Sequence, residues 1–260
     1  MLLGNRANLL VAVAIVAVIS MYLFSGPIPQ DPGYHDFADK RSLFGISNFW
    51  NVMSNLPLLV IGAWGVAFVF RNHDITLPGL ETAYIVFFSG VFLTALGSGY
   101  YHIAPANEPL VWDRLPMTIG FAGFFSVVVG EFVSPYAGRR LLIPMLLAGI
   151  LAVEYWAWTE ASNIGDLRPY AIVVFLPMLL VLAILFLYQP AIGSARYFWW
   201  MILCYALAKA SEFLDAQIYA AGALLSGHSL KHLFAALTPA LVLYMLRHRR
   251  GNSGGAADDT

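Results

Sequence analysis

Two histidines, His228 and His232, stand four residues apart in an apolar stretch, and a third, His102, lies near the end of another. Residues four apart share one helix face, with Cβ atoms about 5–6 Å apart, which suits two ligands of one metal ion. A third imidazole from a distant segment would complete a three-histidine site with one open position, the arrangement of hydrolytic zinc. The alternative is a chance pair and an interfacial histidine with a solvated tip.

Two further polar residues stand beside His102 in the sequence. Ser98 precedes it by one helical turn, and Asp113 opens the next apolar stretch. We expect Asp113 to act as a general base on a zinc-bound water, and Ser98 to position that water or a developing oxyanion. Two structural alternatives stay open: Asp113 as the N-cap of a helix that contains Pro116, and Ser98 bonded to the carbonyl four residues earlier.

Other polar side chains are candidates for supporting the metal ligands. Glu212 and Asp215 stand three residues apart, and a carboxylate there could fix the tautomer of a ligand imidazole. The alternative is a buried ion pair with Lys209 or Lys231. Ser54 is assigned to the same supporting role, because we expect it at the same membrane depth.

The polar segment 27–48 precedes the second apolar stretch. Its Asp36, Asp39 and Asn48 could supply oxygen ligands to a hard cation such as Ca²⁺. A solvated loop that is salt-bridged through Lys40 or Arg41 is the alternative.

The composition indicates the class of protein that carries these residues. The chain has 260 residues, of which 60% are hydrophobic and 11% charged, whereas a soluble domain carries about 25% charged residues. This predicts an integral membrane protein with the lipid bilayer as its surroundings. The net charge of −1 and the lack of a basic block argue against nucleic acid as a partner. The single cysteine, Cys204, excludes an internal disulfide and a cysteine-based metal site, and we interpret it as packing.

Eight stretches are long and apolar enough to cross a bilayer. They are approximately 7–25, 49–70, 83–102, 113–133, 141–158, 169–188, 197–219 and 228–246. The short, turn-rich connections predict an antiparallel all-α bundle: seven transmembrane helices plus an extra N-terminal hydrophobic helix. We therefore divide the chain into an anchor helix or signal peptide (1–26), an external polar loop (27–48), the helical domain (49–246) and a disordered cytoplasmic tail (247–260).

The distribution of Lys and Arg predicts the orientation. We place the C terminus in the cytoplasm, and we interpret the membrane as that of a bacterial cell. Eight basic residues then lie on the cytoplasmic side and four on the other side. With this orientation, seven polar residues that are far apart in the sequence lie at the same depth in the membrane, near its non-cytoplasmic side. They are Ser54, Ser98, His102, Asp113, Asp215, His228 and His232.

This pattern resembles the alkaline ceramidases, which belong to a wider group of seven-helix membrane hydrolases with the adiponectin receptors and the Per1-type lipid remodelling proteins. The resemblance rests on Ser54 in Phe-Trp-Asn-Val-Met-Ser-Asn-Leu, on Ser98-x₃-His102, on Asp113 in Trp-Asp-Arg-Leu-Pro-Met and on His228-x₃-His232. It covers about residues 34–246, with the first apolar stretch as an extra.

The resemblance implies a zinc amidase that cleaves ceramide-like lipids into a sphingoid base and a fatty acid. It implies zinc on His102, His228 and His232, and catalytic roles for Ser98 and Asp113. It also implies a calcium site at Asp36, Asp39 and Asn48, although Asn48 replaces the family's glutamate there and Arg41 a neutral oxygen ligand. The alternatives are a receptor with structural zinc, a hydrolase of other acyl lipids, and a proton-coupled transporter.

Overall fold

The protein is an all-α bundle, as the composition predicts. The structure is a computed structural model that describes residues 2–222 and 224–254. Within these ranges the chain is 79% helical and has no strand. Seven of the helical segments described are long and apolar enough to cross a membrane. A bundle of this kind satisfies its backbone hydrogen bonds within each helix, which a bilayer requires.

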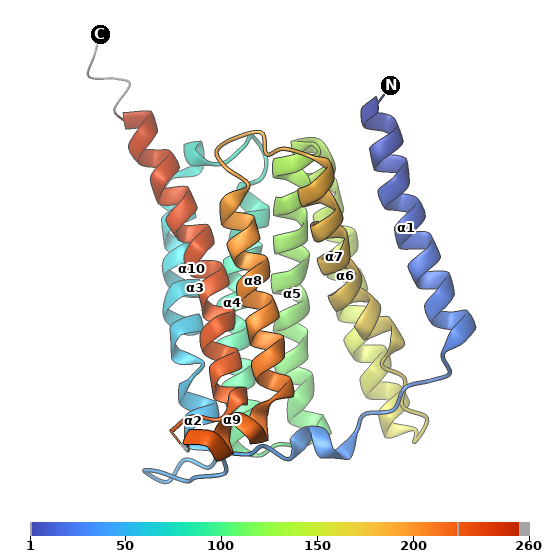
Figure 1. Ribbon diagram of the computed structural model, residues 1–260, viewed down its shortest axis with the longest axis vertical. Helices are drawn as coiled ribbons and strands as arrows, with labels where there is room; N and C mark the ends of the chain where they lie inside the picture. Colours follow the sequence, from blue (N-terminus) through green and yellow to red (C-terminus); the bar gives the residue numbers. More distant parts are fainter. Residues whose placement is uncertain (1, 223, 255–260) are drawn as a thin grey trace.

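Eight of the helices in these ranges are long and run through the bundle or along its edge, and the others are short (Figure 1). The long helices are α1 (Leu2–Phe24), α3 (Leu56–Arg71), α4 (Glu81–Ile103), α5 (Asn107–Phe132), α6 (Pro135–Ala161), α7 (Arg168–Leu187), α8 (Arg196–Phe213) and α10 (Gly227–Gly254), and α2 (Phe49–Met53) continues the line of α3. Besides α2, the short ones are η1 (Pro32–His35), η2 (His73–Ile75) and α9 (Asp215–Gly222). Helix α8 packs along α10 and is not one of the seven membrane-spanning candidates, because its 18 residues include three charged ones, Arg196, Lys209 and Glu212.

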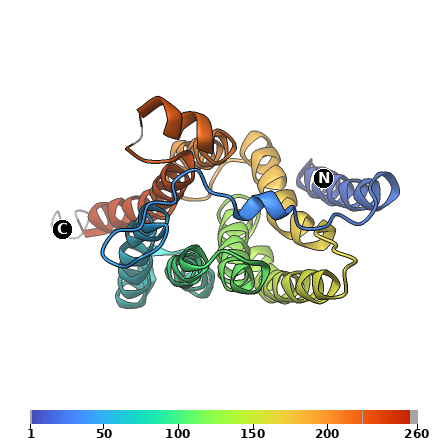
Figure 2. The same ribbon diagram turned by 90° about the horizontal axis from the view of Figure 1, so that it is seen from below.

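Helix α1 stands at the edge of the bundle and packs against α7 (Figures 1 and 2). None of its most apolar window is buried inside the protein, so its side chains suit a lipid environment. Arg6 Nη1 donates to the carbonyl of Leu187 at 2.7 Å, which ties one end of α1 to the end of α7.

Helices α4 and α5 approach each other closely enough to bring Ser98 and Asp113 to the same place. A Cβ atom on Gly90 would lie 2.3 Å from the backbone nitrogen of Gly120, and one on Gly97 would lie 1.8 Å from the carbonyl oxygen of Trp112. Small residues allow membrane helices to pack with their backbones in contact. Glycine at these positions therefore sets the geometry of the candidate site.

The N-cap alternative for Asp113 is wrong. Helix α5 begins at Asn107, six residues before Asp113, and Pro116 lies inside it. Glu108 and Pro109 favour this earlier start, because an acidic residue and a residue without an N–H both suit the first turn of a helix. Asp113 is thus an interior helix residue, and its carboxylate is not used to cap the helix.

Two predicted stretches are interrupted in the structure. The stretch 49–70 divides into α2 and α3 at Ser54 and Asn55, where Pro57 suits the start of a new helix. The stretch 197–219 divides into α8 and α9 at Leu214. Both breaks lie at the end of the bundle that carries α2 and α9, drawn lowest in Figure 1.

The C-terminal helix is longer than the sequence predicts. Helix α10 continues through Arg247 to Gly254, so residues 247–254 are helical where we expected the start of a disordered tail. Arg249 pairs with the buried Glu131 of α5, with N–O distances of 2.8 and 2.9 Å, and this pair holds the extension against the bundle. Residues 255–260 of the predicted tail lie outside the described residues.

Candidate metal centre

Three buried imidazoles converge at the lower end of the bundle. His102 comes from the last turn of α4, and His228 and His232 come from the first two turns of α10. One ligand nitrogen from each lies within 4.8 Å of the other two, and this is the one group of its kind in the described residues. The three residues that the sequence predicts as metal ligands therefore lie together, and the group could hold a metal ion.

The chemistry of the three side chains fits a tetrahedral metal. The Nε2 atoms of His102 and His228 lie 3.2 Å apart, and two nitrogen ligands of tetrahedral zinc lie about 3.3–3.4 Å apart when each bond is 2.0–2.1 Å. His102 Nδ1 is buried and has no hydrogen-bond partner in the part of the chain that the structure describes. No protein group in these ranges therefore fixes the tautomer of His102.

The break between α2 and α3 supplies the support for His232. The Ser54 hydroxyl lies 2.7 Å from His232 Nδ1, and the Asn55 amide nitrogen lies 3.4 Å from the same atom. A hydrogen bond at Nδ1 fixes the tautomer and the orientation of a ligand imidazole, and leaves Nε2 for a metal. The predicted supporting role of Ser54 agrees with this contact, whereas the sequence analysis missed Asn55.

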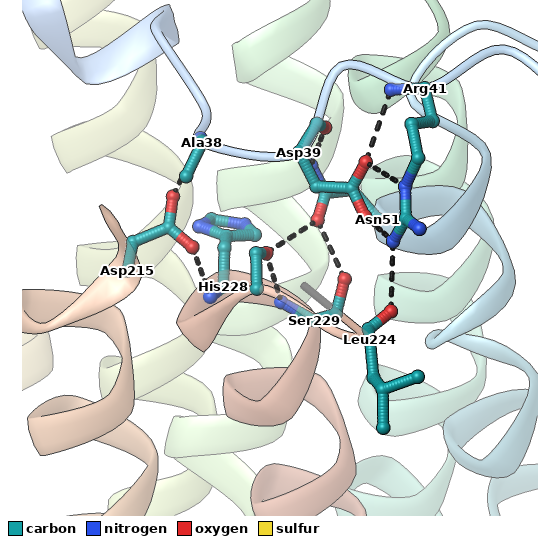
Figure 3. A network of polar contacts seen from close by, with 9 residues as sticks. Ala38, Asp39, Arg41, Asn51, Asp215, Leu224, His228 and Ser229 are labelled. Carbon is teal, nitrogen blue, oxygen red and sulfur yellow. Dashed lines mark hydrogen bonds and ion pairs between the residues drawn. The ribbon is translucent and has the colours of Figure 1, made fainter. Parts of the chain in front are cut away.

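Asp215 supports the backbone of His228. Its two carboxylate oxygens accept from the backbone N–H of His228 at 2.6 Å and from that of Ala38 at 2.9 Å (Figure 3). The carboxylate thus caps the N terminus of α10 and joins it to the segment 25–48, which we call the strap. The prediction that Asp215 orients an imidazole ring is wrong in that form, because the contact is to the main chain.

The strap crosses the lower end of the bundle (Figure 2). Phe37 packs against two of them, with ring centroids 4.7 Å from His102 and 4.4 Å from His228. His35 is held by Tyr101 and Asn107 at 2.8 and 2.9 Å. A phenylalanine in a polar loop has no chemical signature in the sequence, and Phe37 was not predicted. Phe37, which belongs to the strap, lies between the rest of the strap and these two imidazoles.

Asp113 and Ser98 meet beside the histidines. Both are buried, and the Ser98 hydroxyl interacts with the Asp113 carboxylate. Lys231, between the two α10 histidines, acts electrostatically on all three imidazoles and on Asp113. The arrangement therefore combines three imidazoles, a buried carboxylate with a hydroxyl partner, and the nearby positive charges of Lys231 and Arg114.

Glu212 takes part in an ion pair, the alternative that the sequence left open. Its carboxylate contacts the ammonium of Lys209 and, at 3.1 Å, that of Lys231. It therefore holds Lys231 in place and does not contact an imidazole.

The residues of the predicted calcium site have other partners. Asp36 pairs with Lys40, and Asp39 binds both the Nε and Nη2 atoms of Arg41, at 2.9 and 2.6 Å. Asn48 donates its amide to the backbone carbonyl of His102 at 2.9 Å. These contacts match the salt-bridged loop and do not form a cluster of oxygen ligands.

The strap is joined to the start of α10 by a buried polar network. Asn51 Oδ1 accepts from the hydroxyl of Ser229 at 2.8 Å, and its amide donates to the carbonyl of Asp39 at 3.3 Å (Figure 3). Arg41 Nη2 also donates to the carbonyl of Leu224 at 2.8 Å. The strap is therefore held by hydrogen bonds at several positions around the histidines.

Comparison with known proteins adds no family to this description. No protein-family model matches the chain, and no curated protein matches it.

Proposed function

We propose that the protein is an intramembrane zinc-dependent hydrolase that cleaves the amide bond of ceramide-like lipids, releasing a sphingoid base and a fatty acid. The observation that carries this proposal is the convergence of three buried imidazoles beside the Ser98–Asp113 pair. Three histidines with one open coordination position are typical of hydrolytic zinc. The resemblance of the same residues to the alkaline ceramidase motif supports the amide as the bond that is cleaved.

Different residues of the chain have different roles in the proposed hydrolysis. Zinc, held by His102, His228 and His232, would supply Lewis acidity to the attacking water and to the scissile carbonyl. Asp113 accepts the proton of the water and passes it to the leaving amine, as a general base and then a general acid. Ser98 holds the Asp113 carboxylate in position. The Ser54 hydroxyl donates to the carbonyl of Asn51 and accepts from the Nδ1–H of His232, which holds the ring of that ligand.

The location of the site suits a lipid substrate. The strap crosses the lower end of the bundle, and Phe37 packs against the rings of His102 and His228. A substrate that enters from the bilayer would place its scissile bond at this depth, since the amide of such a lipid lies at the boundary between headgroup and acyl chain.

Turnover of defined lipids tests the proposal. Purified protein is incubated with matched N-acyl and O-acyl lipids, and the products are measured by mass spectrometry. We expect release of fatty acid from the N-acyl lipids, and loss of that release in Asp113→Asn. A protein that contains zinc but releases no fatty acid from any lipid would contradict the proposal and favour a receptor with a structural metal.

A further inference from the structure

A mostly apolar groove opens on the side of the bundle between α3 and α4, and the mechanism above does not use it. One wall comes from the turns around Leu56 and Leu59, and the other from the turns around Ala95 and Gly99. The groove has a volume of about 160 Å³, close to that of a cavity that holds one benzene ring. It therefore has room for a short length of one hydrocarbon chain.

The packing of α3 and α4 explains why the groove is present. Nearer the middle of the bundle the two helices touch, since a Cβ atom on Gly62 would lie 2.6 Å from the backbone nitrogen of Phe92. Beyond this contact the residues of α4 that line the groove include the small Ala95 and Gly99. A Cβ atom on Gly99 would meet no neighbouring element of the described chain within 4 Å. Small side chains thus leave the space between the helices open.

The groove faces the bilayer and changes in polarity along its length. Its walls belong to membrane-spanning segments, and Leu56 and Leu96 are 47% and 50% exposed. The end nearer the metal centre carries Asn55 and Tyr100, whereas the other end, at Leu59, is apolar. Tyrosine is typical of the membrane interface. The groove therefore has the order of groups of a lipid, with its polar end at the interface and its chain toward the bilayer centre.

Both walls of the groove adjoin the candidate metal centre. Asn55 is only 2% exposed, and its Nδ2 atom lies 3.4 Å from Nδ1 of His232. On α4, Gly99 follows Ser98 and precedes His102 by one turn. A lipid in the groove would therefore lie against the same side chain, Asn55, that contacts a candidate metal ligand.

The polar end of the groove has an acceptor without a donor. Asn55 Nδ2 donates to the carbonyl of Asn51 at 2.9 Å, whereas Asn55 Oδ1 has no hydrogen-bond partner within the described residues. An unpaired buried acceptor costs free energy, and only an N–H or O–H group can satisfy it. An N-acyl lipid carries such a group beside its chain, whereas the ester region of a diacyl phospholipid carries none. This end of the groove therefore favours an N-acyl lipid.

We propose that the groove between α3 and α4 seats a hydrocarbon chain of the N-acyl lipid substrate, with the polar end of the lipid toward Asn55. This inference rests on the proposed amidase function and assigns a binding site to the chain of its substrate. A bilayer solvates a chain as well as the groove does. The shape of the groove and the acceptor at Asn55 therefore select the lipid, and the hydrophobic effect does not.

Photolabelling with two lipids tests the inference without turnover. The first probe is an N-(alkylsulfonyl)ethanolamine with a diazirine in its alkyl chain, which keeps N–H and hydroxyl groups but cannot be cleaved as an amide. The second probe is phosphatidylcholine with a diazirine at the same position of an acyl chain. Purified protein in phosphatidylcholine vesicles is irradiated with each probe at equal mole fraction, and the labelled peptides are identified by mass spectrometry.

The two probes distinguish a substrate site from general contact with bilayer lipid. We expect the segments around Leu56 and Leu96 to be labelled roughly 3- to 20-fold more by the first probe, the range for one hydrogen bond inside a bilayer. Equal labelling by the two probes, or labelling by the first probe only outside these segments, would overturn the inference.

Filling the groove should remove this labelling. Gly99→Leu places a side chain in the open space, and leucine suits a helix interior better than glycine. Ala63→Leu is the matched control, because Ala63 is an exposed small residue of α3 outside the groove. We expect several-fold less labelling in Gly99→Leu alone, and unchanged labelling there would overturn the inference. If Gly99→Leu does not fold, Leu96→Trp enlarges a half-exposed side chain of the same wall and gives the same test.

Turnover separates this inference from the proposed function. In Gly99→Leu, release of fatty acid from N-palmitoylethanolamine should fall more than release from N-hexanoylethanolamine, which has a shorter chain. An equal effect on both lipids would contradict the groove as the site of the substrate chain and leave the amidase function standing. Selective labelling of the groove without release of fatty acid from any lipid would contradict the amidase function alone.

Discussion

The Nε2 atoms of His102 and His228 lie 3.2 Å apart, although the two residues are 126 positions apart in the sequence. The distance is close to that between two ligands of one tetrahedral metal. Both rings pack against Phe37, so the pair is enclosed by the strap as well as by α4 and α10. The predictions below follow from this enclosed group and the residues around it.

Replacing Ser54 should weaken metal binding. Ser54→Ala removes the hydroxyl that lies 2.7 Å from His232 Nδ1, and loss of such a partner lowers metal affinity by about 10–100-fold. The affinity is measured by competition with a chromophoric chelator. Ser126→Ala is the control, because Ser126 is equally buried and its hydroxyl has no partner within the described residues. Equal affinities in the two variants would mean that Ser54 does not support the ligand.

Replacing Asp113 should separate catalysis from metal binding. Asp113→Asn keeps the shape of the side chain and its contact with Ser98 but removes its basicity. We expect turnover to fall by about 10²–10⁴-fold, the usual contribution of general acid–base catalysis, with unchanged metal content by elemental analysis. A variant that loses its metal, or one with nearly full activity, would show that Asp113 is a ligand or a structural residue.

The Asp39–Arg41 pair should make the strap sensitive to acid. Burial alone would raise the pKa of Asp39, but its hydrogen bonds with Arg41 outweigh this and hold the pKa below its usual value of 3.8. A carboxyl with a lower pKa in the folded protein stabilises the fold above the unfolded pKa, and this stabilisation is lost as the pH falls through the folded pKa.

Asp39→Asn should therefore lower the melting temperature near neutral pH, by roughly 2–4 °C for each kcal/mol lost. The difference from wild type should shrink as the pH falls from about 5 through the lowered pKa of Asp39. Asp36→Asn is the control, because Asp36 pairs with Lys40 in solvent, where ion pairs contribute little. A pH-independent difference in Asp39→Asn would contradict this account of the strap.

The strap should lie outside the cytoplasm, as the distribution of Lys and Arg predicts. The chain has one cysteine, Cys204, so single cysteines can be introduced into a Cys204→Ala background. Lys40→Cys, in the strap, should react with a membrane-impermeant maleimide in intact cells, and His248→Cys should react only after lysis. The reverse pattern would place the metal centre on the cytoplasmic side.

The sequence predicts the helices and the ligands better than it predicts their surroundings. The histidines were found because ionisable residues are rare in apolar stretches and their spacing is helical. Phe37 was missed because its role comes from the path of the strap, and Asn55 because an amide beside a helix break has no distinctive pattern. Hydropathy alone predicts the start of α5 too late, because its first turn contains Glu108 and Pro109 and is less apolar than the rest of the helix.

The metal content of the purified protein tests the central claim most directly. We predict about one zinc per chain by elemental analysis, because three neutral imidazoles with an open position favour Zn²⁺ over Mg²⁺ or Ca²⁺. Zinc and lipid turnover should both be lost in His228→Ala/His232→Ala and retained in His248→Ala, where an exposed histidine of the same helix is removed. Equal zinc content in wild type and in the double variant would contradict the account.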